Sequence, residues 1–268
     1  MSYIIPDPRF EMPELFTPGR KPAGKTAINV GHPMARGLVT HCPFSSSTPV
    51  ANIGSYGGEA IIGGSSGITR NGRGYYFDDS YNDELNKHIR VPIPDSMNAA
   101  LNAMSASGLT AVVHFNAART ALVGSNRDLI VLAGNYLSSN AAQALIINNS
   151  GSGGGEFQSW SGPDSKRIII SSPNLTVGKD EVFAFSYDVA TNNTRIAVNG
   201  VATGEDSLFS SNTGLTYSGY YLLGTDLEGG TTKNFNGTIY SVTMWDRALS
   251  KEELLSVTYN PYQFLLPA

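Results

Sequence analysis

Adjacent carboxylates are the residues in this chain best suited to chemistry, and four such pairs occur before residue 250. The pairs are Asp78-Asp79, Asp83-Glu84, Asp180-Glu181 and Glu205-Asp206. Cleavage of a glycosidic bond with retention needs two carboxyl groups about 5 Å apart, one as nucleophile and one as acid/base. Neighbouring residues of a strand point to opposite faces of a sheet, so an adjacent pair cannot supply both. We therefore interpret the four pairs as solvated turn residues, and they indicate no glycosidase.

Other catalytic patterns are missing from the sequence. There is no G-x-S-x-G elbow, and the four histidines lie far apart in the chain. The run GSGGG at residues 151–155 lacks the Lys-Ser/Thr ending of a phosphate-binding loop. Cys42 is the single cysteine, which excludes an intrachain disulfide and a cysteine-rich zinc site, and we expect it to be buried. These features predict a protein that is not an enzyme.

Calcium is the one metal that the acidic loops suggest. Asp78, Asp79 and Asp83 fall in one loop, and Asp226 and Glu228 fall in another. Carboxylate oxygens are ligands that calcium prefers. The sequence alone does not bring the two loops together, so ordinary polar turns are the favoured interpretation. We expect no cofactor and no metal, with a structural calcium ion as the alternative.

Aromatic residues in loops are the candidates for contact with a sugar. Tyr81 precedes the strand at Ile89, Trp160 follows the glycine-rich run, and Tyr217 precedes another strand. A sugar site needs an exposed aromatic ring beside amide or carboxylate groups, but aromatic residues of strands usually lie in a core or an interface. Trp245 is expected in the core. Tyr81, Trp160 and Tyr217 remain candidate glycan contacts.

The composition and the spacing of apolar residues predict an all-β fold. Charged residues make up 15% of the chain, against about 25% in typical soluble domains. Gly, Ser, Thr and Asn take their place, as expected where tight turns join short strands. The expected strands lie at residues 75–77, 89–91, 109–115, 129–132, 144–147, 167–170, 182–187, 195–198, 220–224 and 237–245. Strands at this spacing, almost without helix between them, predict an antiparallel two-sheet jelly-roll sandwich.

Local signals identify one hairpin and two helices. Asn199-Gly200 is the strongest short hairpin dipeptide, because both residues tolerate positive φ in a type I′ turn. Ser250 and Glu253 form a capping box at the start of a short C-terminal helix, which Pro261 stops. Leu249 and Leu254 are spaced as its hydrophobic staple. A second short helix is expected from Asp95 to about Met104.

Residues 1–36 are interpreted as an extended N-terminal arm, and residues 37–268 as one domain. The arm is rich in proline and carries large apolar side chains without a period: Tyr3, Ile4, Ile5, Phe10, Leu15 and Phe16. An extended proline-rich segment loses little entropy when it docks on a surface. We expect these six residues to bind a partner, and the alternative is that the arm packs back on its own domain.

The sequence gives no reason to expect nucleic-acid binding, a membrane span or a signal peptide. The net charge is −4, and Lys and Arg form no stripe, so no nucleic acid is expected. No apolar stretch of about 18 residues suggests a membrane span. Residues 1–30 hold no apolar run typical of a signal peptide, so we expect synthesis in a cytoplasm without secretion.

Two segments near the C-terminus carry a resemblance to a known family. Residues 183–201 read FAFSYDVATNNTRIAVNGV, and residues 237–260 read GTIYSVTMWDRALSKEELLSVTYN. Both resemble the last strands of the concanavalin A-like lectin/glucanase superfamily, in its laminin-G-like branch. Phe77-Asp78 matches an earlier strand pair of that branch. The resemblance implies a lectin-like jelly roll, and the E-x-D-x-x-E signature of its glucanases does not occur in this sequence.

The two ends of the chain resemble laminin-G-like proteins encoded by bacteriophages. Residues 21–44 contain HPMARGL, and residues 260–267 read NPYQFLLP. This resemblance implies a structural virion component, either a capsid decoration protein or a tail-associated protein, that is located in the virion and binds other phage proteins. A homo-oligomer would be natural for such a subunit. The alternative is a glycan-binding adhesin that recognises cell-surface polysaccharide.

Overall fold

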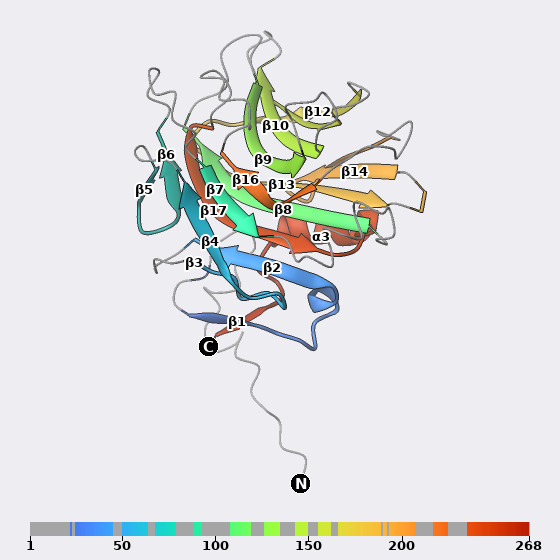
Figure 1. The fold of residues 1–268 in the computed structure, drawn as a ribbon. Coiled ribbons are helices and arrows are strands. Elements are labelled where there is room, and N and C mark those ends of the chain that lie inside the picture. Colours follow the sequence, from blue (N-terminus) through green and yellow to red (C-terminus); the bar gives the residue numbers. More distant parts are fainter. Residues whose placement is uncertain are drawn as a thin grey trace.

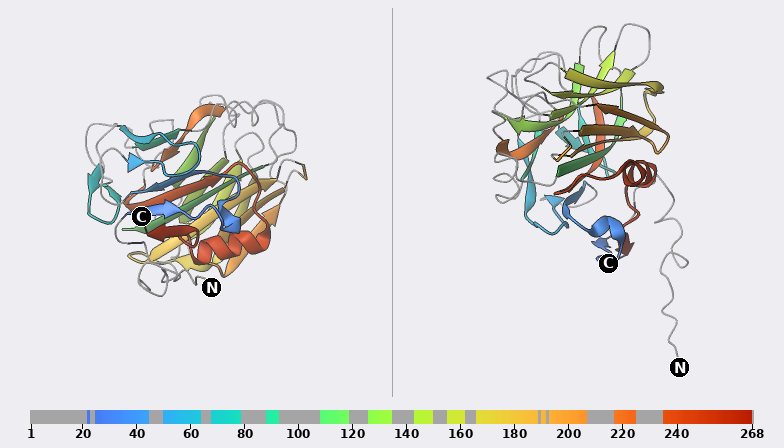
Figure 2. Two further views of the ribbon diagram at one scale, coloured as in Figure 1. Left: turned by 90° about the horizontal axis from the view of Figure 1, so that it is seen from below. Right: turned by 90° about the vertical axis from the view of Figure 1, so that its right-hand side faces the viewer.

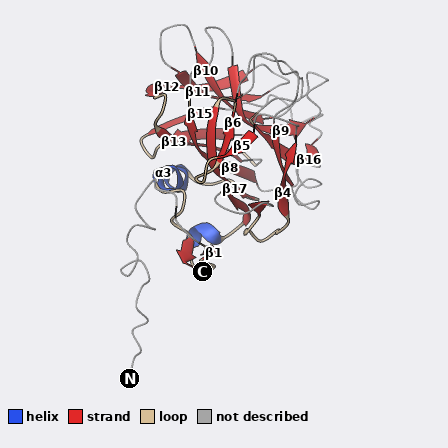
Figure 3. Cartoon of the chain, turned by 90° about the vertical axis from the view of Figure 1, so that its left-hand side faces the viewer, coloured by secondary structure: helices blue, strands red, loops and turns tan. Residues whose placement is uncertain are grey.

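The computed structural model is a sandwich of two antiparallel sheets (Figure 1). It describes Pro22 and residues 25–44, 50–63, 68–78, 88–92, 108–118, 126–134, 143–149, 155–161, 166–188, 190–191, 193–206, 217–224 and 235–267. Strands make up most of this part of the chain (Figure 3). The predicted antiparallel jelly-roll sandwich with a short C-terminal helix is confirmed. No helix in the described ranges is long and apolar enough to cross a membrane.

Sheet 1 contains eight strands. Their spatial order is β12 (Lys166–Leu175), β11 (Gly155–Ser161), β10 (Gln143–Asn149), β9 (Asn126–Gly134), β16 (Tyr217–Leu223), β7 (His88–Pro92), β4 (Glu59–Gly63) and β3 (Val50–Ala51). Ile89, Val91 and Leu223 are fully buried. Ile89 and Val91 share one face because side chains alternate along a strand, and this face meets the other sheet.

Sheet 2 also contains eight strands. The order along it is β15 (Ala202–Asp206), β14 (Asn193–Val198), β13 (Asp180–Asp188), β8 (Gly108–Ala117), β17 (Gly237–Trp245), β6 (Tyr75–Phe77) and β5 (Ile68–Arg70), and β2 (Leu38–Pro43) also pairs with β17. On β13 the alternating residues Phe183, Phe185 and Tyr187 are buried, and they point toward sheet 1. Val182 and Ala184 point the other way, and we call that side the outer face of sheet 2.

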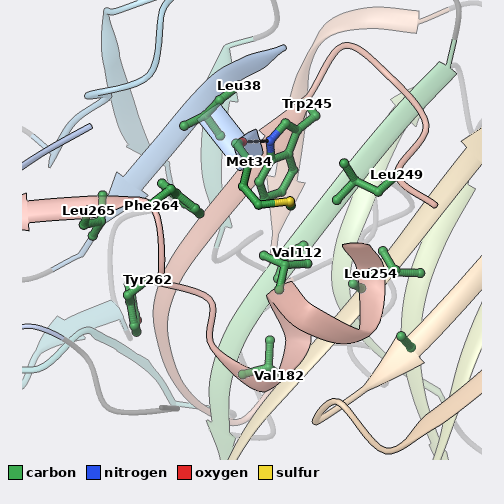
Figure 4. Close-up of a cluster of buried hydrophobic side chains, with 13 residues drawn as sticks. Met34, Leu38, Val112, Val182, Trp245, Leu249, Leu254, Tyr262, Phe264 and Leu265 are labelled. Atoms are coloured by element: carbon green, nitrogen blue, oxygen red, sulfur yellow. Dashed lines mark hydrogen bonds between the residues drawn. The ribbon is translucent and has the colours of Figure 1, made fainter. Parts of the chain in front are cut away.

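The outer face is covered by residues 26–36, by the C-terminal segment and by one helix (Figure 2). Strand β1 (Thr26–Ile28) pairs with β18 (Leu265–Pro267), a 3-10 turn η2 (Pro33–Ala35) follows β1, and helix α3 spans Lys251–Tyr259. The covering segments and the sheet share one buried cluster (Figure 4), which contains Met34, Leu38, Val112, Val182, Ala184, Ala197, Trp245, Leu249, Leu254, Val257, Tyr262, Phe264 and Leu265. Residues 26–36, assigned to the arm from the sequence, thus pack on the domain. The arm residues Tyr3, Ile4, Ile5, Phe10, Leu15 and Phe16 lie outside the described residues.

Helix α3 begins where the sequence predicts. Ser250 Oγ accepts a hydrogen bond from Glu253 N at 3.2 Å, and Ser250 N donates to Glu253 Oε2 at 2.9 Å, which completes the capping box. Arg247 binds both oxygens of Glu253, at 2.9 and 2.8 Å. The staple residues Leu249 and Leu254 are fully buried. The helix ends at Tyr259, before Pro261. The helix expected from Asp95 to Met104 lies outside the described residues.

The hairpin between β14 and β15 turns at Asn199-Gly200, as predicted. Their φ angles are 51° and 70°, which fits the positive φ of both central residues in a type I′ turn. The turn also touches the end of α3, because Thr258 Oγ1 accepts a hydrogen bond from Gly200 N at 3.0 Å. The same hydroxyl lies 2.8 Å from Leu254 O within the helix. Thr258 therefore links the β14–β15 hairpin to the end of α3.

Candidate functional site

A pocket of about 180 Å³ opens at one end of the outer face, where α3 ends. Three structural units form it. The turn before β13 and the start of that strand provide Lys179, Asp180 and Val182, strand β8 provides His114, and the hairpin turn with the end of α3 provides the rest. The last group comprises Asn199, Thr258 and Tyr259. The pocket therefore depends on four segments of the sequence, around residues 114, 180, 199 and 258.

Asp180 is the fixed acidic group of the pocket. Its Oδ1 accepts hydrogen bonds from Asn116 Nδ2 at 2.9 Å and Tyr240 OH at 2.8 Å, and its Oδ2 lies 2.9 Å from Arg73 Nη2. The Arg73 guanidinium also lies over the Tyr240 ring, 4.9 Å from its centroid. Burial acts to raise the pKa of Asp180, but the three hydrogen bonds outweigh it and lower that pKa. Asp180 is therefore ionised and oriented near neutral pH.

Glu181, the next residue of β13, is the second acidic group at the start of this strand, and it is buried. It is 2% exposed and accepts a hydrogen bond from Asn199 Nδ2, while Asn199 Oδ1 accepts one from Val182 N at 2.7 Å. Burial is the main cause that raises the pKa of Glu181, against the lowering effect of Asn199. The prediction that Asp180-Glu181 is a solvated turn pair is wrong, because β13 already begins at Asp180 and turns Glu181 into the protein.

The buried Glu181 carboxylate predicts a pH-dependent stability difference. A carboxyl group whose pKa is raised on folding stabilises the fold fully below its unfolded pKa of about 4.3, and this stabilisation is lost as pH rises through the folded pKa. Glu181→Gln keeps an oxygen for Asn199 but carries no charge. We expect its free energy of unfolding, relative to the natural protein, to rise between pH 4 and pH 8. Urea unfolding at both pH values measures this, and a constant difference would contradict the assignment.

Tyr259 gives the pocket an exposed aromatic ring. It is the last residue of α3, and its side chain is 60% exposed. Lys179, an exposed residue of the neighbouring turn, lines the same pocket. An aromatic face, an ammonium group, an amide and an oriented carboxylate thus border one small opening. This is the combination that a sugar site needs.

Two of the three residues chosen from the sequence as glycan contacts, Trp160 and Tyr217, lie in the other sheet. Tyr81 lies outside the described residues. Trp160 is in β11 and Tyr217 is in β16, both in sheet 1, with β10 and β9 between them; their side chains are not among the described ones. Of the residues considered for calcium, only Asp78 is described. The described ranges hold no group of three or more His, Cys, Asp or Glu residues that could bind a metal ion.

Three comparisons place the chain among known proteins. The family model of the concanavalin A-like lectin/glucanases superfamily, a laminin G model, matches residues 96–255. None of the curated protein sequences is significantly similar to this chain. Among solved structures, a botulinum neurotoxin serotype D/C binding domain has a TM-score of 0.59 at 13% identity, over 84% of this chain and 52% of that one. Trypanosoma rangeli sialidase in complex with sialic acid has a TM-score of 0.52 at 13% identity, over 84% of this chain and 33% of that one. This chain therefore spans about half of the first protein and a third of the second, and the likeness concerns the fold.

Proposed function

We propose, since this chain belongs to the concanavalin A-like lectin/glucanase superfamily, that it is a glycan-binding module whose ligand site is the pocket at the end of α3. The observation that carries the proposal is that the exposed residue Tyr259 lines one pocket together with Lys179 and Asn199. The pocket is small, about 180 Å³, compared with about 300–1,000 Å³ for sites of drug-sized ligands. It therefore suits one sugar ring of a longer glycan.

The chemistry of the lining residues supports a saccharide ligand. The Tyr259 ring offers an apolar face for the C–H groups of a pyranose. The Lys179 ammonium provides up to three donors for hydroxyl or carboxylate oxygens. Asp180 is held in place by Arg73, Asn116 and Tyr240, so it does not have to reorganise when a ligand binds. Preorganised polar groups around one exposed ring favour specific though shallow binding.

Two proteins of similar fold lend further support. The sialidase with a similar fold was solved in complex with sialic acid, and the botulinum neurotoxin DC binding domain was solved in complex with SialylT. Each ligand belongs to that protein. Their relevance here is that a similar sandwich occurs in proteins that were solved with saccharide ligands.

The proposal is tested on a glycan array with the full chain. We expect the natural protein to bind a subset of glycans, and Lys179→Ala/Tyr259→Ala to lose at least about tenfold in affinity, since removing one good contact costs on the order of 1–2 kcal/mol. Both residues are exposed, so the variant should remain folded. Tyr56→Ala is the matched control, because Tyr56 is 44% exposed and lies outside the pocket. Retention of binding by the double variant would refute this site.

A second candidate function is a structural role in a bacteriophage particle, with other virion proteins as partners and a homo-oligomer as the form. The observation that favours it is that the two phage-like ends form one unit, since β1 pairs with β18. Removal of residues 1–21 leaves that unit intact, whereas removal of residues 1–36 would take Met34 out of the core. We expect the full chain, and not the shortened one, to sediment with particles lacking this component. Equal sedimentation of the full chain and the shortened chain would count against residues 1–21 as the tether.

A further inference from the structure

A row of polar side chains crosses the outer face of sheet 2 and ends at the pocket beside α3. Strand pairing places its members opposite one another on five neighbouring strands, β5, β6, β17, β8 and β13 (Figure 1). In that order they are Thr69, Tyr76, Thr238, Asn116 and Asp180, which we call the polar row. Neighbouring strands lie about 4.8 Å apart, so the four steps of the row span about 19 Å.

All five side chains lie on the outer face. Asp180 is in step with Val182 and Ala184, which point to that face, and residues that pair across neighbouring strands share a face. Thr69 is exposed, Tyr76, Asn116 and Asp180 are half-buried, and Thr238 is buried. Beneath α3 the outer face is apolar, whereas every member of the row carries a hydrogen-bonding group.

Two turns hold the row in place. From the turn between β5 and β6, Asn71 Nδ2 donates to Thr238 Oγ1 at 2.8 Å. From the turn before β13, Gly178 O accepts a hydrogen bond from Asn116 Nδ2 at 2.9 Å, and the same amide group donates to Asp180 Oδ1 at 2.9 Å. Both hydrogens of Asn116 Nδ2 are thereby used, so its side chain offers a ligand the Oδ1 acceptor. A row fixed in this way does not have to reorganise when a ligand binds.

The row and the pocket are continuous, because Asp180 belongs to both. The pocket holds about 180 Å³, which suits one sugar ring, so a longer glycan must cross a neighbouring surface. We propose, on the basis of the proposed function, that the ligand is an oligosaccharide whose further units lie along the row from Asp180 toward Tyr76 and Thr69. Tyr76 provides a second aromatic ring, and the hydroxyl and amide groups match the hydroxyls of a sugar chain.

The chemistry around the pocket favours this direction. Val177 and Val201 are 46% and 72% exposed, and each lies two positions from a lining residue, Lys179 or Asn199. A valine side chain has no group that binds a sugar hydroxyl. The row, in contrast, presents donors and acceptors at each of its steps. The hydroxyls of a sugar chain are therefore satisfied along the row and not over the two valines.

Paired titrations of the full chain test the row. The probes are the tetrasaccharide that binds best on the array and each of its constituent monosaccharides. We expect the natural protein to bind the tetrasaccharide at least about tenfold more tightly than any of the monosaccharides. Thr69→Ala/Tyr76→Ala should weaken tetrasaccharide binding about fivefold or more and leave the monosaccharide affinity unchanged. The unchanged monosaccharide affinity then shows that the variant is folded and its pocket is intact.

Arg70→Ala is the matched control. Arg70 is an exposed residue of β5, next to Thr69, and it pairs with Tyr75, so it points to the opposite face. We expect this variant to bind both probes as the natural protein does. Thr69→Ala alone is the second variant, because Thr69 is exposed and its truncation leaves the core untouched. We expect it to weaken tetrasaccharide binding about twofold or more.

The outcomes separate the row from the pocket. Tetrasaccharide binding that survives Thr69→Ala/Tyr76→Ala but is lost in Lys179→Ala/Tyr259→Ala would overturn the row and leave the pocket as the site. A monosaccharide that binds the natural protein as tightly as the tetrasaccharide would overturn the row in the same way. If the natural protein binds no glycan, the proposed function is wrong, and the row is wrong with it.

Discussion

Trp245→Ala is expected to lower the free energy of unfolding by about 3–5 kcal/mol, the range for removing a buried large aromatic residue. Trp245 is fully buried on the outer face of sheet 2, among residues of α3 and both chain ends. Its ring lies 5.9 Å from that of Phe264, and its Nε1 donates to Met34 O at 2.7 Å. One side chain thus joins the N-terminal turn, the C-terminal segment and the sheet.

Trp245→Phe separates the contribution of the buried aromatic ring from that of the hydrogen bond between Trp245 Nε1 and Met34 O. Phenylalanine keeps most of the apolar volume but leaves Met34 O without its donor, which predicts a smaller loss of about 1–3 kcal/mol. Urea unfolding of the natural protein and both variants gives the comparison. A loss below about 1 kcal/mol for Trp245→Ala would mean that the covering segments contribute little to stability.

Gly200→Ala is expected to lower the free energy of unfolding by about 3 kcal/mol and to weaken glycan binding. A residue other than glycine at positive φ costs about 1–2 kcal/mol, and Gly200 has a φ of +70°. A Cβ atom there would also lie 2.5 Å from Tyr259 Cβ and 3.2 Å from Leu255 O. Because helix backbone cannot yield as a flexible side chain does, the end of α3 must shift, and Tyr259 shifts with it.

Gly57→Ala is a closely matched control for this prediction. Gly57 has a φ of +69°, and no atom lies within 4 Å of a Cβ built there. It therefore reports the cost of positive φ alone, about 1–2 kcal/mol, without a clash. Unfolding and glycan titration of both variants measure the difference. Equal losses for the two glycines would show that the contact between the hairpin and α3 does not shape the pocket.

The strands and the capped helix could be predicted because their signals are local. Phe183, Phe185 and Tyr187 alternate over a few residues, and the φ angles of Asn199 and Gly200 follow from their side chains alone. Ser250 and Glu253 likewise act within one turn of helix. Strand β11 is absent from the expected strands, because the glycine-rich run that leads into it carries no strand signal.

The pairing of β1 with β18 and the pocket at the end of α3 could not be predicted, because both depend on residues far apart in the sequence. Strands β1 and β18 have three residues each, too few for a periodic pattern, and they pair across nearly the whole chain. Lys179, Asn199 and Tyr259 come from two turns and a helix end that meet only in the fold. A register shift between Ile239 and Ser241 likewise puts Tyr240 beside Asp180, where strict alternation would not.

The central claim is that a glycan binds at the end of α3, and a chemical-shift titration tests it most directly. Isotope-labelled full-length protein would be titrated with the glycan that binds best on the array. We predict that the largest shifts occur at Lys179, Asn199, Gly200 and Tyr259. Shifts centred on Trp160 or Tyr217 in sheet 1, or no shifts at all, would contradict the assignment of this pocket.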